Sequence, residues 1–465
     1  MLSFLDKANT VAPSDYNRFL VPPAALCVHL CIGQAYAFST FVIPLSHLIG
    51  GDKAAADDWT ELQAGRTFSI AIVFLGLSAA VFGRWVEEGG PRRAMFTAAL
   101  CFSGGFLLSA VGAWLHQLWL LYLGYGVLGG CGLGIGYISP VSTLIKWFPD
   151  RPGMATGFAI MGFGGGAMIG GPLSVNFMKI FGSWNIPLWG HSATGGVAET
   201  FLAMGAIYLV YMMIGSLIVR IPAPGWAPAG YVVPVTARAL VTAANVEVNE
   251  AMKTRQFYLL WGILCLNVSA GIGVLNYAAP MIQYVFPDHV NKVIAGGFVG
   301  FLSIFNMAGR LFWSSISDYI GRRPTYMIFF LLGILLYAIV PTTGHLGSTA
   351  LFVAAFAIIF TMYGGGFATI PAYLRDIFGT MHVGAIHGRL LTAWSVAGIV
   401  GPEIVGRIRE HEISQGVPDA DSYDLSMYIM AGLLAVGFLC NYFVSAVDSR
   451  HHFKAGASVP APAGE

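Results

Sequence analysis

One arginine, Arg310, stands inside a long apolar stretch of the sequence, where its chemistry is that of an anion receptor. Asn306 precedes it by one helical turn and lies on the same face of a helix. A charge in such a stretch costs a few kcal/mol or more unless it lines a cavity or meets an opposite charge. A planar guanidinium offers two parallel hydrogen bonds to a carboxylate. Arg310 is therefore the predicted counter-charge of a bound anion.

A purely structural role for Arg310 is the competing interpretation. Asp318 follows eight residues later and could brace the end of the helix by pairing with it. Eight residues span about 12 Å along a helix, so we do not expect a direct bond. Asp318 instead opens a charged turn with Gly321, Arg322 and Arg323. Such turns are typical of cytoplasmic loops in membrane proteins.

The composition predicts a membrane protein. Of the 465 residues, 56% are hydrophobic and only 10% are charged, whereas about a quarter of the residues in a soluble domain are charged. The net charge of +1 gives no reason to expect a nucleic-acid partner. The six cysteines lie in apolar runs without the spacing of a metal site. We expect no cofactor, no metal and no enzymatic activity, because no Walker motif, haem pattern or catalytic triad is visible.

Twelve apolar runs are long enough to cross a bilayer, at roughly twenty residues each. They lie near 21–48, 65–84, 94–115, 118–145, 153–178, 198–220, 256–285, 293–316, 324–343, 349–374, 385–407 and 425–447. The fold class we expect is an all-α membrane protein whose twelve transmembrane helices form two six-helix pseudo-repeats. Its parts would be a cytoplasmic N-terminus (1–20), a first bundle (21–220), a cytoplasmic linker (221–254), a second bundle (255–447) and a cytoplasmic tail (448–465).

Weak self-similarity supports a duplication. In the first half, Pro140-Val-Ser-Thr-Leu-Ile-Lys-Trp-Phe148 leads to Gly157 and Gly171-Pro172; in the second, Pro371-Ala-Tyr-Leu-Arg-Asp-Ile-Phe378 leads to Gly388 and Gly401-Pro402. Parallel repeats related by an axis along the membrane normal place a substrate site near the midplane, between the halves. We expect Arg310 to face that central cavity. The residues predicted to gate it are Asp318, Arg322, Arg323, Arg92 and Arg93.

Several motifs together resemble the oxalate/formate antiporter family of the major facilitator superfamily, which is related to the monocarboxylate transporters. The motifs are Ile32-Gly-Gln-Ala-Tyr36-Ala-Phe38, Gly134-Ile-Gly-Tyr137-Ile-Ser-Pro140, Lys146-Trp-Phe-Pro-Asp-Arg-Pro-Gly153, Asn306-xxx-Arg310 and Gly364-Gly-Gly-Phe-Ala-Thr-Ile-Pro371. The resemblance implies that Arg310 binds a substrate carboxylate, with Asn306 beside it. It also implies that Tyr36, Tyr137 and Gln34 enclose the anion; ordinary helix packing is the alternative for both tyrosines.

Departures from the family pattern narrow the expected cargo. Oxalate transporters carry a lysine in the eleventh span, where this chain has Trp394. One cation neutralises one carboxylate, so a dianion would leave a buried charge unpaired at a cost of several kcal/mol. We therefore expect a small monocarboxylate, with Trp394 as an apolar wall. Thr40 and Asn306 replace the residues tied to proton binding in the monocarboxylate transporters, so proton symport is not implied.

Other titratable residues are candidates for a coupled proton or for the gate. Glu403 lies within a late span, where it could instead pair with Arg407, and His29 and His47 lie near the ends of the first span. A histidine near a helix end is usually interfacial. A further group of charged and histidine residues, which we expect to form a solvated latch between the tenth and eleventh spans, consists of Arg375, Asp376, His382, His387 and Arg389.

These features predict a secondary transporter of small organic anions such as pyruvate, lactate or formate, working by alternating access. The partners would be the carboxylate, a coupled proton or counter-anion, and the lipid bilayer. We expect a monomer in the inner cell membrane with both termini cytoplasmic. The alternatives are a dicarboxylate exchanger of the oxalate type, a transporter-like nutrient receptor, and a carrier of uncharged or cationic solutes in which Arg310 is structural.

Overall fold

The computed structural model describes residues 3–453, apart from 14, 52–54, 184, 187–189, 192–193, 232–239 and 243. Lys53, Arg238 and Lys454, together with the end of the predicted tail, lie outside the described residues. Within the described part, twelve helices are long and apolar enough to cross a membrane. The expected all-α membrane fold is confirmed.

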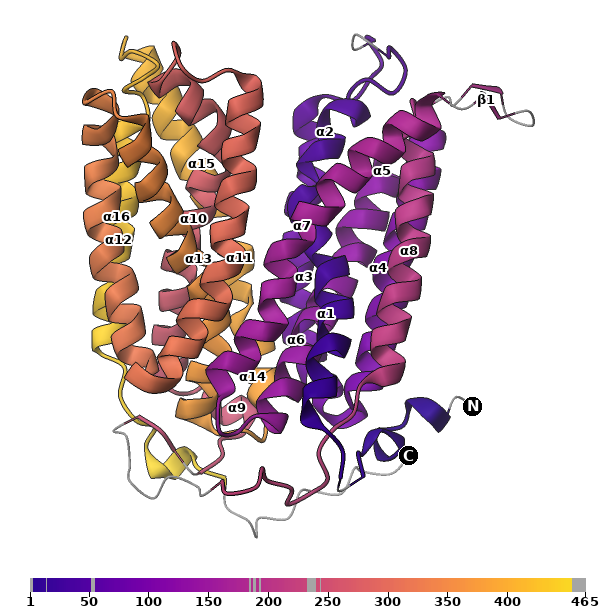
Figure 1. Ribbon diagram of the computed structural model, residues 1–465, viewed down its shortest axis with the longest axis vertical. Helices are drawn as coiled ribbons and strands as arrows, with labels where there is room; N and C mark the ends of the chain where they lie inside the picture. The colour runs from indigo at the N-terminus through magenta and orange to yellow at the C-terminus, as the bar shows by residue number, and fades with distance from the viewer. Residues whose placement is uncertain are drawn as a thin grey trace.

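The helices form two bundles that stand side by side (Figure 1). The first bundle contains α1 (Val21–Ile32), α2 (Ser39–Leu45), α3 (Glu61–Gly89), α4 (Pro91–Trp114), α5 (Leu118–Leu121), α6 (Gly130–Trp147), α7 (Pro152–Ser183) and α8 (Val197–Ile218). The second contains α10 (Arg255–Val285), α11 (Lys292–Ile320), α12 (Arg322–His345), α13 (Thr349–Phe378), α14 (Val383–Leu390), α15 (Thr392–Ser414) and α16 (Asp424–Tyr442).

Three of the spans are interrupted. A 3-10 segment, η4 (Gly33–Ala37), separates α1 from α2, and a π-helical segment, η5 (Tyr122–Gly129), separates α5 from α6. The third break falls between α14 and α15, at Leu391. Interruptions of this kind are frequent at functional sites.

The break in the first span lies where this span touches the backbone of α7. A Cβ on Gly33 would lie 2.3 Å from the backbone oxygen of Phe163, and one on Gly166 would lie 2.4 Å from that of Leu30. Only glycine permits backbones to approach so closely. The first span is therefore held directly against α7.

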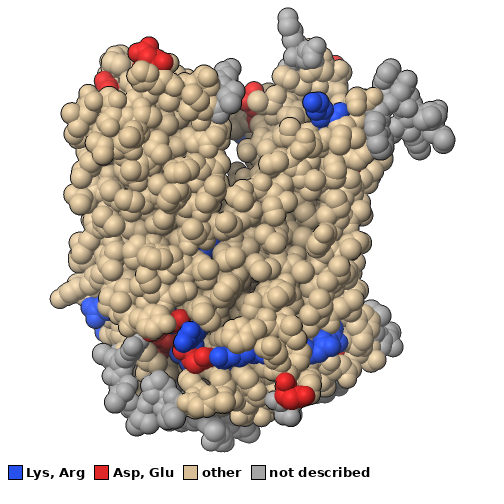
Figure 2. Space-filling view, viewed as in Figure 1, with Lys and Arg blue, Asp and Glu red and all other residues tan. Residues whose placement is uncertain are grey.

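The two bundles touch at one end of the molecule and part at the other. The space-filling view is hollowed between the bundles at the end opposite the N-terminus (Figure 2). At the end that carries the N-terminus and α9 (Val248–Ala251), α14 lies between the bundles (Figure 1). We call this the termini side. The structure is therefore closed on the termini side and open on the other.

Short additional elements lie outside the membrane-spanning helices. They are η1 (Ser3–Leu5), η2 (Lys7–Thr10), η3 (Arg18–Leu20), η6 (Ser449–His451) and the antiparallel pair β1 (Asn185–Ile186) and β2 (Gly190–His191). The end of the linker is attached to the second bundle, because Thr242 and Val246 donate backbone hydrogen bonds to Asp376 and Phe378. Its beginning is attached to the first, because Trp226 packs on Trp147 of α6. Part of the predicted linker, 232–239 and 243, lies outside the described residues.

Candidate functional site

Arg310 lies on α11, at the contact between the two bundles. Its Nε donates to Asn306 Oδ1 at 3.1 Å, and its Nη1 donates to the backbone oxygen of Ile160 on α7 at 3.2 Å. The side chain has no exposed surface. The expectation that the guanidinium faces an open cavity is therefore not met in this state, because α7 closes over it.

One nitrogen of this guanidinium, Nη2, has no hydrogen-bond partner in the described part of the chain. A buried polar atom left in this way costs about 1–3 kcal/mol, and more when it is charged. The donor is therefore available to a ligand. Asp318 does not supply the missing partner, because its hydrogen bonds run to α7 and Arg322.

Glycine on α7 makes room for the arginine. A Cβ on Gly164 would lie 2.9 Å from Arg310 Nε, and one on Gly157 would lie 2.1 Å from Ser314 Oγ. Side chains of α11 therefore occupy the space that a side chain on α7 would fill at these two positions. The glycine-rich fifth span thus determines how closely the first bundle approaches the cation.

Aromatic side chains enclose the guanidinium. Its Cζ lies 5.3 Å from the centre of the Phe367 ring and 5.8 Å from that of Phe163, within the range of cation–π attraction. Trp394 packs on both rings, with centroids 4.5 Å and 5.4 Å away. The arginine is therefore screened from water by a largely apolar wall.

The tyrosines predicted for the site join this wall. Tyr36 lies 6.1 Å from Trp394 and Tyr137 lies 5.6 Å from it, between ring centroids. The Tyr137 hydroxyl and Trp394 Nε1 have no hydrogen-bond partner. The Tyr36 hydroxyl lies beside Arg310 and Tyr363 without hydrogen-bond geometry to either. Unpartnered donors thus gather around Arg310 from both bundles.

Gln34 is anchored within the first bundle. Its Oε1 accepts a hydrogen bond from the Tyr125 hydroxyl at 3.0 Å, and its Nε2 has no partner. A Cβ on Gly170 would lie 2.8 Å from Gln34 Cγ. The structure therefore brings together Arg310, Asn306, Tyr36, Tyr137 and Trp394 by direct contacts, and places Gln34 against Tyr125 and α7.

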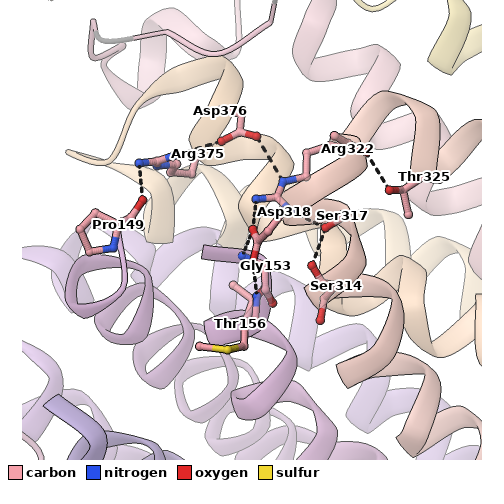
Figure 3. A network of polar contacts seen from close by, with 12 residues as sticks. Pro149, Gly153, Thr156, Ser314, Ser317, Asp318, Arg322, Thr325, Arg375 and Asp376 are labelled. Carbon is pink, nitrogen blue, oxygen red and sulfur yellow. Dashed lines mark hydrogen bonds and ion pairs between the residues drawn. The ribbon is translucent and has the colours of Figure 1, made fainter. Parts of the chain in front are cut away.

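The termini side is closed by an acid that caps a helix of the other bundle (Figure 3). Asp318 accepts hydrogen bonds from the backbone amides of Gly153 and Met154, at 2.8 Å and 2.9 Å. These amides lie in the first turn of α7, where the helix dipole favours a negative charge. Arg322 holds the carboxylate at 2.6 Å. We call this arrangement the Asp318 latch.

Neighbouring charges extend the latch. Arg322 also bonds Asp376 at 3.2 Å, and Arg375 donates to the backbone oxygen of Pro149 at 3.3 Å (Figure 3). The bond from Arg375 to Pro149 links the two bundles. Part of the charged group expected between the tenth and eleventh spans therefore contributes to closure, and it does so from the end of α13.

A second latch was not predicted from the sequence. Glu87 of α3 accepts a hydrogen bond from the backbone amide of Gly384 on α14 at 3.0 Å and pairs with Lys146. This repeats the Asp318 arrangement with the bundles exchanged. The sequence feature that could have revealed this latch is an acidic residue shortly before a pair of arginines, which occurs in both repeats, at Glu87 and at Asp318.

The other arginines predicted for the gate bond within their own bundles. Arg92 donates to backbone oxygens of Phe4, Asn9 and Leu217. Arg93 pairs with Asp6 at 2.8 Å. Arg323 donates to the backbone oxygen of Tyr442. These bonds fix helix ends to adjacent segments and do not cross between the bundles in this state.

Two of the titratable residues lie where the sequence did not place them. His29 and His387, expected near a helix end and in a solvated loop, have no exposed surface. Glu403 pairs with Arg407 at 2.6 Å, as the four-residue spacing suggested, and both side chains are more than half exposed. The carboxylate is therefore at the surface, whereas the histidines are internal.

Comparison with known proteins identifies the family. A model of the Major Facilitator Superfamily matches residues 25–402. The chain is 28% identical to the oxalate:formate antiporter of Oxalobacter formigenes, over 83% of each chain. It is 24% identical to apicoplast pyruvate carrier 1 of Toxoplasma gondii, over 91% of this chain and 88% of the carrier. It is also 24% identical to human monocarboxylate transporter 11, over 72% of this chain and 65% of that transporter.

Solved structures show the same fold. The fucose:proton symporter of E. coli superposes with a TM-score of 0.66 at 14% identity, covering 93% of this chain and 100% of the symporter. A bacterial homologue of the iron transporter ferroportin, in an outward-facing state, superposes with a TM-score of 0.62 at 15% identity. The superposition covers 91% of this chain and 98% of the homologue.

Proposed function

Because the chain belongs to the major facilitator superfamily, we propose that it is a secondary transporter of small organic anions, with monocarboxylates such as pyruvate, lactate or formate as its preferred cargo. The observation that carries this proposal is the buried Arg310 with its unpartnered Nη2. In a dry site, the pair formed by a guanidinium and a carboxylate is stronger than in water. The similarity to a pyruvate carrier and to monocarboxylate transporters supports the same cargo class.

The preference for one carboxylate rests on the charges around the site. Arg310 is surrounded by Phe163, Phe367 and Trp394, and none of these can balance a second negative charge. His29 is a further basic group close enough to Arg310 for the two to interact electrostatically. A methyl or aryl end of the acid would lie against the aromatic wall, while Asn306 holds the guanidinium in place through its Oδ1.

Transport would proceed by alternating access. In the conformation seen here, the termini side is closed by the Asp318 latch and by the second latch, which Glu87 forms with Gly384. Movement of α7 away from α11 would break the bond between Arg310 and Ile160 and admit the anion. We place both termini in the cytoplasm and the protein in the inner cell membrane. Lysine and arginine gather towards the termini side in Figure 2, in agreement with the positive-inside rule.

Exchange of a dicarboxylate is the second candidate function. It is favoured by the 28% identity to the oxalate:formate antiporter. It requires a second cation in the site when the dianion is bound. A thermal-shift series on the purified protein, with acids of one to four carbons, separates the two candidates. Either the monocarboxylates or the dicarboxylates should raise Tm strongly, and the other class should not.

Counterflow in proteoliposomes tests the proposal. Vesicles loaded with unlabelled pyruvate should take up labelled pyruvate, and Arg310→Gln should abolish this uptake. Arg407→Gln is the matched control, because Arg407 is an exposed arginine whose only described bond is to Glu403. Normal uptake by the Arg310 variant would remove the arginine from the substrate site.

A further inference from the structure

Two buried histidines from opposite bundles meet on the ring of Tyr137. His29 of α1 stacks on this ring with a centroid distance of 5.3 Å and an interplanar angle of 19°. His387 of α14 contacts the ring with a centroid distance of 5.8 Å. Neither histidine has exposed surface. We call these three residues the His29–Tyr137–His387 stack.

Among the described residues, three of the four ring nitrogens of the stack lack hydrogen-bond partners. His29 Nε2 lies 3.2 Å from the backbone oxygen of Tyr137, and it must carry a hydrogen because a carbonyl only accepts. The basic lone pair is then on Nδ1, which has no hydrogen-bond partner among the described residues, although the backbone of Ala159 lies close to this ring. Both ring nitrogens of His387, and the Tyr137 hydroxyl, are also unpartnered. Such groups remain buried at a cost unless another state of the protein satisfies them.

His387 lies in a tight seam between the bundles. A Cβ on Gly388 would lie 2.1 Å from the backbone oxygen of Ala79, and one on Gly83 would lie 2.8 Å from Ala385 Cα. The backbones of α14 and α3 are therefore in direct contact, with His387 beside that contact. Figure 1 shows α14 on the termini side, between the bundles. Opening of this side must separate the seam and bring water to His387.

Few charged groups surround the stack. On α1, His29 is the titratable group that acts on His387, and Arg310 of α11 acts on His29. The carboxylate of Glu87 on α3 is held by Gly384 and Lys146, at the first turn of α14. On α13, Asp376 is held by Arg322 and Arg375.

Among the described residues, the charged groups on the remaining neighbours of α14 do not act on His387. On α9, Glu250 is held by Lys253 and His451. Arg389, on α14 itself, points to Val248 and Asn249. The buried polar side chains of α10 are the uncharged Gln256, Asn267 and Ser269, and Asn267 Oδ1 has no partner among the described residues. Among the described residues, the stack is thus a neutral, unsatisfied group placed between Arg310 and the seam.

We propose that the His29–Tyr137–His387 stack is the site of a coupled proton, which His387 accepts from water when the termini side opens. This inference rests on the proposed transport of a carboxylate. Burying an imidazolium without a partner is strongly unfavourable. When the seam closes, a proton can therefore stay only if the carboxylate held by Arg310 compensates its charge. Without the acid, the proton returns to water before closure, so the acid and one proton move together.

The experiment measures proton movement together with the acid. Proteoliposomes containing the full chain and a pH-sensitive dye receive labelled pyruvate in a buffer one pH unit below that of the lumen. Protein-free liposomes report passive entry of the undissociated acid. One proton per monocarboxylate supports roughly tenfold accumulation at equilibrium, so wild-type vesicles should acidify and accumulate the acid faster than protein-free ones.

His387→Gln should lose the protein-dependent acidification and accumulation, because an amide cannot carry the proton. Counterflow at equal pH should persist in this variant, since exchange of acid for acid needs no net proton transfer, and its persistence shows that the variant folds. His29→Gln gives the same test from the other bundle. His289→Gln, at an exposed position outside the stack, is the matched control and should behave as wild type.

The outcomes separate the two proposals. Wild-type counterflow without proton movement, or proton-driven accumulation in both histidine variants, overturns the proton site and leaves carboxylate transport standing. Absence of any wild-type counterflow overturns the proposed function. Water access to His387 is then measured without substrate, by diethylpyrocarbonate modification and mass spectrometry. Modification should rise when Asp318→Asn weakens the latch, and an unmodified His387 in that variant would overturn the proton site.

Discussion

Arg310 on α11 donates a hydrogen bond from Nη1 to the backbone oxygen of Ile160 on α7, 3.2 Å away. The side chain proposed to hold the substrate therefore also holds the two bundles together. A carboxylate that takes both terminal nitrogens would have to displace the Ile160 oxygen. Substrate binding and separation of the bundles would then be linked through one guanidinium.

Replacing Arg310 by lysine keeps the charge and removes the fork of donors. We expect pyruvate to bind roughly 10- to 100-fold more weakly, because one hydrogen bond to a charged group contributes about 1.5–3 kcal/mol. The apparent KM of counterflow measures this. Arg407→Lys, made at the exposed arginine of α15, should leave KM unchanged. A KM unaltered by Arg310→Lys would mean that planar, two-point recognition is not used.

Adding a methyl group at Gly164 should displace the arginine without removing it. The new Cβ would lie 2.9 Å from Arg310 Nε, so the guanidinium or α7 must shift. We expect counterflow to fall by about tenfold or more, because small misplacements at a binding site are costly. Gly297→Ala, on α11 with nothing within 4 Å of the added carbon, is the control. Equal activity of the two variants would contradict the close fit.

Placing a lysine at Trp394 tests the charge argument. Trp394→Lys adds a buried cation that lacks an acid partner, which costs several kcal/mol without ligand. Oxalate should therefore raise the Tm of this variant more than it raises that of wild type. Trp394→Phe, which removes Nε1 and adds no charge, should not gain the oxalate response. Strong stabilisation of the natural protein by oxalate would favour the dicarboxylate alternative.

Weakening the Asp318 latch should open the termini side. In Asp318→Asn, the carboxylate that accepts hydrogen bonds from the Gly153 and Met154 amides loses its negative charge. Hydrogen bonds to a charged group contribute about 1.5–3 kcal/mol each. The open state should become at least roughly tenfold more populated. Maleimide labelling of a Ser142→Cys variant, next to Gly384 in the seam, reports this opening. Glu403→Gln, at an exposed pair outside the latch, should leave the labelling rate unchanged.

The ion pair between Arg18 and Asp150 should make stability depend on pH. Partial burial alone would raise the pKa of Asp150, but hydrogen bonds and charge from Arg18 outweigh it, and the pKa lies below its usual value. A lowered folded pKa means that the stabilisation is present above about pH 4 and is lost as pH falls through the folded pKa.

We therefore expect Asp150→Asn to lower Tm at pH 7, by at most a few degrees for a partly exposed pair. The difference from wild type should disappear in acid. The control is Asp288→Asn, at an exposed aspartate. A difference that persists unchanged at pH 3 would show that Asp150 acts through something other than its charge.

The twelve spans and the contact between Arg310 and Asn306 could be predicted from the sequence, because they depend on local hydropathy and on the helical repeat. The burial of His29 could not, since it depends on α6 and α7 covering a position that looks terminal. Phe163 and Phe367 were missed for the same reason: among 32 phenylalanines, only the tertiary packing distinguishes the two beneath the guanidinium.

The breaks in the spans were also beyond prediction from the sequence, and the second latch was indicated only by the acid that precedes Arg92 and Arg93. The residues of η5 and η4 do not indicate in the sequence that the hydrogen-bond pattern changes there. The role of Glu87 was missed because its partner in the other bundle is a backbone amide, Gly384 N, and a backbone partner cannot be recognised from residue type. The grouping of unpartnered polar atoms around Arg310 likewise exists only once the bundles are assembled.

Calorimetric titration of pyruvate into the purified protein tests the central claim most directly. The account predicts saturable heat of binding for wild type and for Arg407→Gln. It predicts no measurable binding for Arg310→Gln when the thermal unfolding of that variant shows an intact fold. Saturable binding of equal affinity to Arg310→Gln would contradict the account, because the carboxylate would then be recognised without the buried cation.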